Sequence, residues 1–120
     1  MQQAQLLIPE FQLELRFTAG RQNKQILIDE LKTASADVSI LKGADTLSNL
    51  RAMAADLKVC GEGLWDRFRT PKEDICWYYR EKLLASKGLK DHALTKDLFF
   101  ESLVLFEEIF GETIFQRHWC

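Results

Sequence analysis

Apolar and polar side chains alternate near the start of the chain. In the stretch FQLELRFT, apolar residues occupy every second position from Phe11 to Phe17, with polar residues between them. Such residues share one face of a strand, whereas on a helix they would scatter around the axis. We therefore predict a strand over 10–18. A lone strand leaves backbone groups unpaired, so we expect it to pair either with the β-branched run DVSIL at 37–41 or with the same strand of a second subunit.

Helical periodicity dominates the rest of the chain. Helix-favouring residues and an i, i+4, i+7 apolar stripe predict a helix over 23–35, although the isoleucines in this stretch also fit a continued hairpin. Asp45 or Thr46 can cap a second helix, which ends at Gly61 in a position suited to a left-handed C-cap. Its apolar stripe consists of Leu47, Leu50, Ala54 and Leu57.

Two further helices have clear start signals. In the sequence TPKE, Thr70 supplies a capping hydroxyl, proline takes the first helical position and glutamate the third, which is a capping box. This helix should end near Gly88. Thr95 is the expected cap of the last long helix, 96–110. These elements predict a helix-dominated α+β fold of three to four helices with a short N-terminal strand or hairpin; the alternative is an all-α bundle.

The composition fits one globular domain over residues 1–120. The chain is 47% hydrophobic and 28% charged, and no repeat or linker divides it. Its net charge of −2 supplies no field that attracts nucleic acid. No apolar run is long enough to span a bilayer, and the N-terminus lacks the basic flank and apolar run of a signal peptide. We therefore expect a cytoplasmic protein without membrane or nucleic-acid partners.

The sequence contains no recognisable catalytic or metal-binding motif. Its three cysteines are widely spaced without C-x-x-C, and its two histidines lack ligand spacing, so we expect no disulfide, metal or cofactor. No nucleophile elbow, phosphate loop or acid–base pair is present, and we lean against an enzyme. Charge is uneven, because 58–90 is net basic and 91–120 net acidic. These segments either attract one another, within or between subunits, or form two solvated helix faces.

Aromatic side chains gather around the TPKE helix start. Aromatic walls with a few placed polar groups are typical of a ligand pocket, although core packing explains the same residues. On the helix, Tyr78 is expected to point outward. Arg80 falls inside the apolar arc, where it must snorkel, meet a ligand anion or pair with a carboxylate, for which Glu107 is the candidate. The predicted pocket consists of Trp65, Phe68, Trp77, Tyr79 and Arg80.

The last helix is apolar over more than half its circumference. Besides its main apolar face it carries a second strip, Phe100 and Val104, beside Glu107. Burying one helix on nearly all sides is difficult in a small domain, so the strip is either buried or an interface. We expect a small soluble, non-catalytic interaction or regulatory protein that self-associates through this helix. A dimer is the oligomer expected first. The alternative is a small-molecule-binding protein that uses the aromatic pocket.

Overall fold

The structure is a computed structural model that describes residues 21–114, and every regular element in that range is helical. The strand predicted over 10–18 lies outside the described residues. From 21 to 114 no strand is present, which fits the all-α alternative. The elements follow in the order α2 (Arg21–Lys32), α3 (Ala36–Cys60), the 3-10 segment η1 (Gly61–Arg67), α4 (Lys72–Ala85), the 3-10 segment η2 (Lys87–Asp91) and α5 (Lys96–Phe110).

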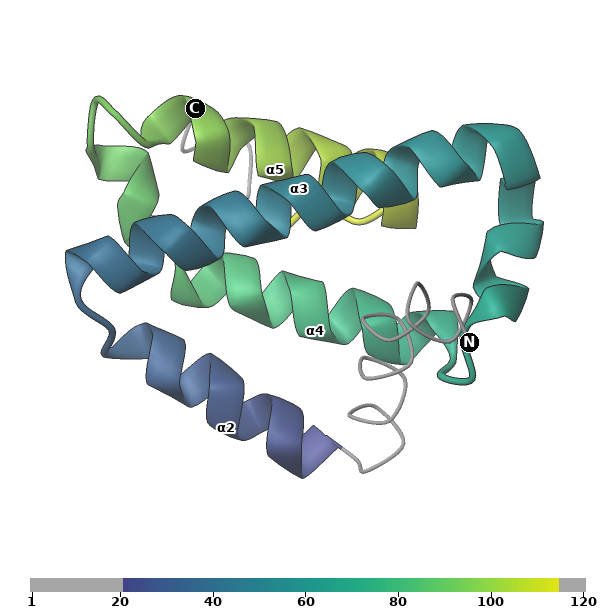
Figure 1. The fold of residues 1–120 in the computed structure, drawn as a ribbon, viewed down its shortest axis with the longest axis horizontal. Helices are drawn as coiled ribbons and strands as arrows, with labels where there is room; N and C mark the ends of the chain where they lie inside the picture. Colours follow the sequence, from purple (N-terminus) through teal and green to yellow (C-terminus); the bar gives the residue numbers. More distant parts are fainter. Residues whose placement is uncertain (1–20, 115–120) are drawn as a thin grey trace, which may run out of the picture.

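The four helices pack as two interleaved pairs (Figure 1). α3 and α5 lie side by side and run in the same direction, α4 returns in the opposite direction beneath them, and α2 lies along α4. α4 also contacts α5, which joins the two pairs. A single apolar core lies between them. Its largest fully buried apolar side chains are Tyr79, Phe99, Phe106, Ile28, Leu50, Leu64 and Ile75.

The run at 37–41 is helical, so its prediction as a strand is wrong. It forms the first turns of α3, because the Ser35 Oγ accepts a hydrogen bond from the Val38 backbone N at 3.3 Å and caps the helix. Asp37 lies in the first turn, where a carboxylate interacts favourably with the helix dipole. The helix therefore begins well before the predicted caps at 45–46. The apolar stripe predicted for it does pack in or against the core.

Gly43 lies inside α3 at a close approach to its neighbours. A Cβ at this position would be 2.7 Å from Leu89 Cδ1 and 3.3 Å from Leu98 Cδ2. Glycine costs a helix interior about 1 kcal/mol relative to alanine. Here the missing side chain lets α3 pack directly against η2 and α5, which explains a glycine at this position of the helix.

The capping box predicted at Thr70 is not formed, because the chain stays extended for one residue longer. Pro71 is the N-cap, with φ −60° and ψ 149°, and its carbonyl accepts the first helical hydrogen bonds, from Asp74 N at 3.0 Å and Ile75 N at 3.3 Å. Thr70 therefore lies outside the helix. Its side chain is buried, and its hydroxyl has no hydrogen-bond partner.

Other helix boundaries agree with the sequence to within a few residues. The helix predicted over 23–35 is α2, which covers Arg21–Lys32 and so begins and ends a little earlier than predicted. The last helix covers 96–110 as predicted and ends at Gly111, at φ 73°. Thr95 occupies its N-cap position, but the hydroxyl makes no capping hydrogen bond. Gly61 ends α3 as predicted, with a positive φ of 60°, but its ψ of −153° lies outside the left-handed helical region that was expected of this cap.

Tyr78 is buried, so the prediction that it points into solvent is wrong. α2 packs on that side of α4, and Lys24 Nζ lies 4.1 Å from the centre of the Tyr78 ring. Lys82 Nζ lies 5.0 Å from the same ring. The helix projection of α4 alone does not reveal this face, because its partner is brought there by tertiary packing.

Candidate functional site

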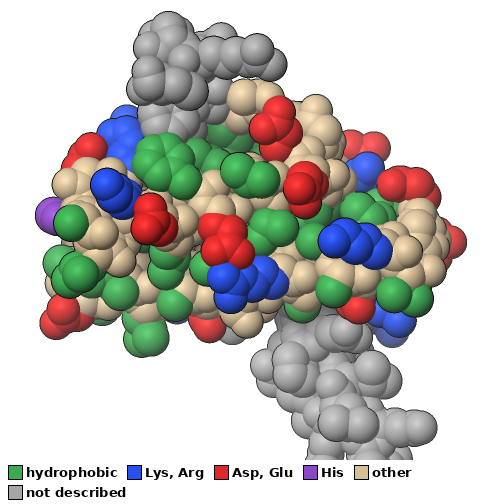
Figure 2. Space-filling model, turned by 90° about the horizontal axis from the view of Figure 1, so that it is seen from above, with side chains coloured by type: hydrophobic (Ala, Val, Ile, Leu, Met, Phe, Trp, Pro, Cys, Tyr) green, Lys and Arg blue, Asp and Glu red, His purple; other side chains and the backbone are tan. Residues whose placement is uncertain are grey.

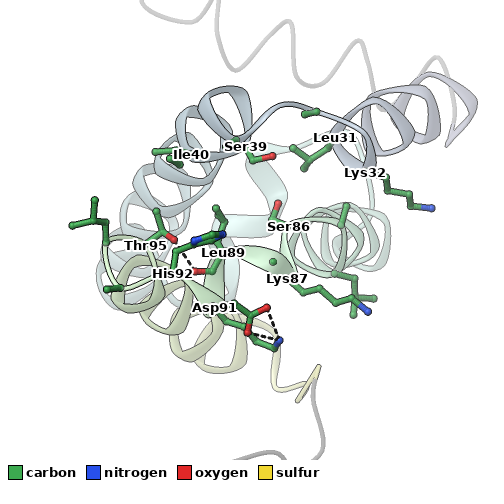
Figure 3. A pocket seen from close by; sticks show the side chains of 18 of the residues that line it. Leu31, Lys32, Ser39, Ile40, Ser86, Lys87, Leu89, Asp91, His92 and Thr95 are labelled. Atoms are coloured by element: carbon green, nitrogen blue, oxygen red, sulfur yellow. Dashed lines mark hydrogen bonds and ion pairs between the residues drawn. The ribbon is translucent and has the colours of Figure 1, made fainter.

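A groove of about 910 Å³ opens at one end of the bundle. Three helix termini and one loop form it: the end of α2, the start of α3, the end of α4, and the η2 segment with the residues that lead into α5. Its apolar lining includes Leu84. Leu31 and Leu89 also belong to this lining (Figure 3). None of these elements forms the groove alone, so the site depends on how the helix ends meet.

The hydroxyl groups in the groove are largely satisfied by the protein itself. The Ser86 Oγ donates to the Lys82 carbonyl at 2.8 Å, and the Thr95 Oγ1 donates to the Leu89 carbonyl at 2.7 Å. The Ser39 hydroxyl points into the groove from α3 (Figure 3). The hydroxyl protons of Ser86 and Thr95 are therefore already in hydrogen bonds with backbone carbonyls, and few polar groups of this wall need a hydrogen-bond partner from a ligand.

Charged side chains surround the groove with a small excess of positive charge. Three lysines line it, Lys32, Lys87 and Lys90, against two carboxylates, Glu81 and Asp91. Most of these charges are paired. Glu81 lies 3.7 Å from Arg80, and Asp91 lies 3.2 Å from Lys90. Lys32 lies 3.4 Å from Asp29. The N-terminal ends of α3 and α5 border the groove, and so do the C-terminal ends of α2 and α4, so the partial charges of the helix ends largely offset one another.

Large apolar side chains are exposed around the same end of the molecule. Ile40 and Leu94 line the groove at 41% and 95% exposure, and Val38 and Leu41 are exposed on the same turns of α3. Seen from above, hydrophobic side chains show at the end that carries the described histidine (Figure 2). An apolar rim of this kind is typical of a surface that binds a partner.

The residues of the predicted aromatic pocket do not line this groove, and the structure brings only some of them together. Trp65 and Phe68 pack with their ring centres 6.2 Å apart, and Trp65 also contacts Phe110 at 5.5 Å. Trp77 lies on α4, and the Arg21 guanidinium lies 4.5 Å from the centre of its ring. Tyr79 is in the core, where burial raises the pKa of its phenol above the usual range. Whether any of them binds a ligand stays a prediction.

Arg80 pairs with a carboxylate, but the predicted partner, Glu107, is wrong. The Arg80 Nη1 donates a hydrogen bond to Glu112 Oε1 at 3.0 Å. Gly111 turns the chain after α5 so that Glu112 reaches α4, whereas Glu107 accepts a hydrogen bond from Thr113 Oγ1 at 2.9 Å. The half-exposed Arg80 therefore pairs with a carboxylate just beyond α5, Glu112, and not with a carboxylate on α5 itself.

The same Glu112 contacts the thiol of Cys76. The thiol lies 3.4 Å from Glu112 Oε2 and donates to it. Burial, and then this hydrogen bond, raise the pKa of Cys76 to about 11. A thiol with such a pKa is almost wholly protonated at neutral pH, so the geometry makes Cys76 a poor nucleophile.

The predicted interface residues lie on the outer face of α5. Val104 is 55% exposed and Phe100 is 36% exposed, while Glu107 is exposed beside them. At the edge of this face, Glu101 binds Arg51 of α3 through two hydrogen bonds of 2.7 Å, which hold its carboxyl pKa below the usual range. This pair links α5 to α3. Carboxylates and hydrophobic groups are interspersed on the face seen in Figure 2.

The groove was not predicted from the sequence. The sequence signal for it was the set of apolar residues at 38–41 and Leu94, which are exposed in the structure. The residues at 38–41 were interpreted as part of a strand. Among residues 21–114, no group of three or more histidine, cysteine, aspartate or glutamate side chains could hold a metal ion. In the same range no helix is long and apolar enough to cross a membrane.

Comparison of the chain with models of protein families, with curated proteins and with solved structures finds no match.

Proposed function

We propose that this protein is a non-catalytic interaction protein that self-associates through the outer face of α5. The observation that carries the proposal is the exposed apolar strip on that helix. Val104 and Phe100 are four residues apart, so they lie one above the other on one helix face. Removing the exposed parts of both side chains from water would contribute about 1–2 kcal/mol per copy.

The surroundings of the strip have the character of an interface rim. Asp97, Glu107 and Glu108 are exposed around it. Interfaces commonly have an apolar centre and a polar, solvent-accessible border. α5 packs along α3, and the exposed Arg51–Glu101 pair links the two helices, so the face is already ordered before association, which lowers the entropic cost of binding.

The oligomeric state in solution tests this proposal. Light scattering of the wild-type protein should give a mass above the monomer mass of 13.9 kDa. Val104→Arg should give the monomer mass, because it places a charge in the centre of the interface. Val59→Arg is the matched control. It makes the same substitution at a valine that is 86% exposed near the C-terminal end of α3, away from the strip, and it should associate like the wild type. A wild type that remains monomeric would reject the proposal.

A second candidate function is small-molecule binding around Trp65. The indole Nε1 of Trp65 and the hydroxyl of Thr70 are both buried without a hydrogen-bond partner. An unsatisfied buried donor costs about 1–3 kcal/mol, which a ligand acceptor would recover. Titration of a panel of metabolites and aromatic cations should then shift the tryptophan emission of the wild type but not of Trp65→Phe. No shift with any compound would remove this candidate.

A further inference from the structure

The chain turns back onto the bundle directly after α5, over residues 111–114, which we call the strap. Gly111 adopts φ 73° and ψ 17°, a left-handed conformation that ends α5, and its N–H donates to the Glu107 carbonyl at 2.8 Å. The Thr113 Oγ1 donates to the Glu107 side chain at 2.9 Å. Ile114 is half-buried and packs against the core. The strap therefore follows a defined path along the bundle.

Glu112 joins the strap to α4 through both oxygens of its carboxylate. Its Oε2 accepts a hydrogen bond from the Cys76 thiol at 3.4 Å, and its Oε1 accepts one from Arg80 Nη1 at 3.0 Å. Cys76 and Arg80 are four residues apart on α4, so they lie on one face of that helix. Cys76 is only 6% exposed. One carboxylate of the strap therefore lies against the buried sulfur and pairs with the neighbouring guanidinium at the same time.

The contacts of Glu112 are weak enough to break without unfolding the bundle. The ion pair is exposed, with 31% of the Arg80 side chain and 48% of the Glu112 side chain accessible to solvent, and exposed pairs contribute little to stability. A thiol is a weak hydrogen-bond donor. Arg80 also has a second carboxylate neighbour on α4, Glu81 at 3.7 Å, which stays in place when Glu112 leaves. Segments attached by a few such contacts open locally at a much lower free-energy cost than global unfolding.

We infer that the strap is a redox-sensitive switch, which shields the Cys76 sulfur while Glu112 is in place and exposes it when Glu112 is released. Glu112 Oε2 occupies the space next to the sulfur, so the carboxylate and a group bonded to that sulfur exclude one another. Modification of Cys76 therefore holds the strap open and separates Glu112 from Arg80. The switch does not require the proposed self-association.

The co-reactant that fits this switch is a small disulfide. In the open state the Cys76 thiol loses its proton to solvent, and the thiolate attacks one sulfur of the disulfide. A new S–S bond joins Cys76 to that sulfur, the original S–S bond breaks, and the other half leaves as a thiolate. Cys76 is oxidised and the leaving sulfur is reduced, so no further oxidant is required. A thiol reductant reverses the exchange, after which the strap can close again.

The rate of this exchange tests the switch. The full-length chain with Cys60→Ser and Cys120→Ser keeps Cys76 as its only thiol, and dithiobis(nitrobenzoate) is the disulfide, because its leaving thiolate absorbs visible light. Glu112→Ala in this background should speed the reaction about tenfold, because it removes both contacts of the carboxylate. Glu108→Ala is the matched control, since it makes the same substitution at an exposed glutamate of α5, and it should react like the background.

Hydrogen exchange gives a second readout, which does not depend on ionisation of the thiol. Attachment of the nitrobenzoate group to Cys76 should speed amide exchange at Gly111 and through the strap, while α3 keeps its protection. Equal acceleration of the thiol reaction by Ser35→Ala, which weakens the α3 cap, would overturn the inference, because the sulfur would then be reached by global unfolding. An unchanged rate in Glu112→Ala would also overturn it, as would labelling that leaves exchange in the strap unchanged or removes protection from all the described helices.

Discussion

The buried thiol of Cys76 should make the stability of the fold depend on pH above neutrality. Burial, and then Glu112, raise its pKa from 9.0 to about 11. Because the folded pKa lies above the unfolded one, this stabilisation is fully present below pH 9 and is lost as the pH rises to 11. One pKa unit corresponds to about 1.4 kcal/mol, so about 1 kcal/mol should be lost between pH 8 and pH 10.

The measurement is urea unfolding in the presence of a reductant, followed by circular dichroism, for wild type and Cys76→Ala. From pH 8 to pH 10 the free energy of unfolding of the wild type should fall by about 1 kcal/mol relative to that of Cys76→Ala. Other titrating groups, such as Tyr79, are common to both proteins and largely cancel in this difference. Glu112→Gln should reduce the change but not abolish it, because burial is the larger cause. Parallel pH dependences for wild type and Cys76→Ala would refute the reasoning.

Three further predictions concern the helices and are measured by the same unfolding experiment at neutral pH. Leu50→Ala should lower the free energy of unfolding by about 2–5 kcal/mol, because the side chain is 0% exposed; Leu41→Ala, at 70% exposure, should cost under about 0.5 kcal/mol. Ser35→Ala should cost about 1 kcal/mol through loss of the α3 cap, and no change would mean that the cap does not hold the helix start. Gly43→Val should cost about 1–3 kcal/mol, because the added side chain meets Leu89, whereas an unchanged stability would contradict the close packing.

The sequence predicted most helices because each one carries its own signals. The last helix is bounded by Thr95 and Gly111, and both ends agree with the structure. The start of α3 was missed because the β-branched residues at 37–41 favour a strand by propensity, whereas the Ser35 cap and packing against η2 and α5 decide for a helix. Local propensity is weak beside such tertiary contacts. The strand predicted over 10–18 stays a prediction, because it lies outside the described residues.

Less of the candidate site was predictable, because it depends on contacts between distant residues. The partner of Arg80 is Glu112, beyond the turn at Gly111, and a helix projection that ends with the helix does not include it. The groove needs the ends of three helices, and no single stretch of sequence shows it. The exposed strip at Phe100 and Val104 was visible from the sequence, since it follows from the apolar circumference of one helix.

The interleaved pairing of helices determines how the chain can acquire its structure. α3 has its main helical partner in α5, and α2 has its partner in α4, whereas neighbours in sequence such as α2 and α3 make few contacts. No early helical hairpin can therefore bury its own apolar face, and the long-range contacts must form together. During synthesis, the apolar face of α3 would stay exposed to solvent until α5 has left the ribosome. The described helices should accordingly fold as one cooperative unit, only after α5 has been synthesised, and should be prone to aggregation when translation stops before α5.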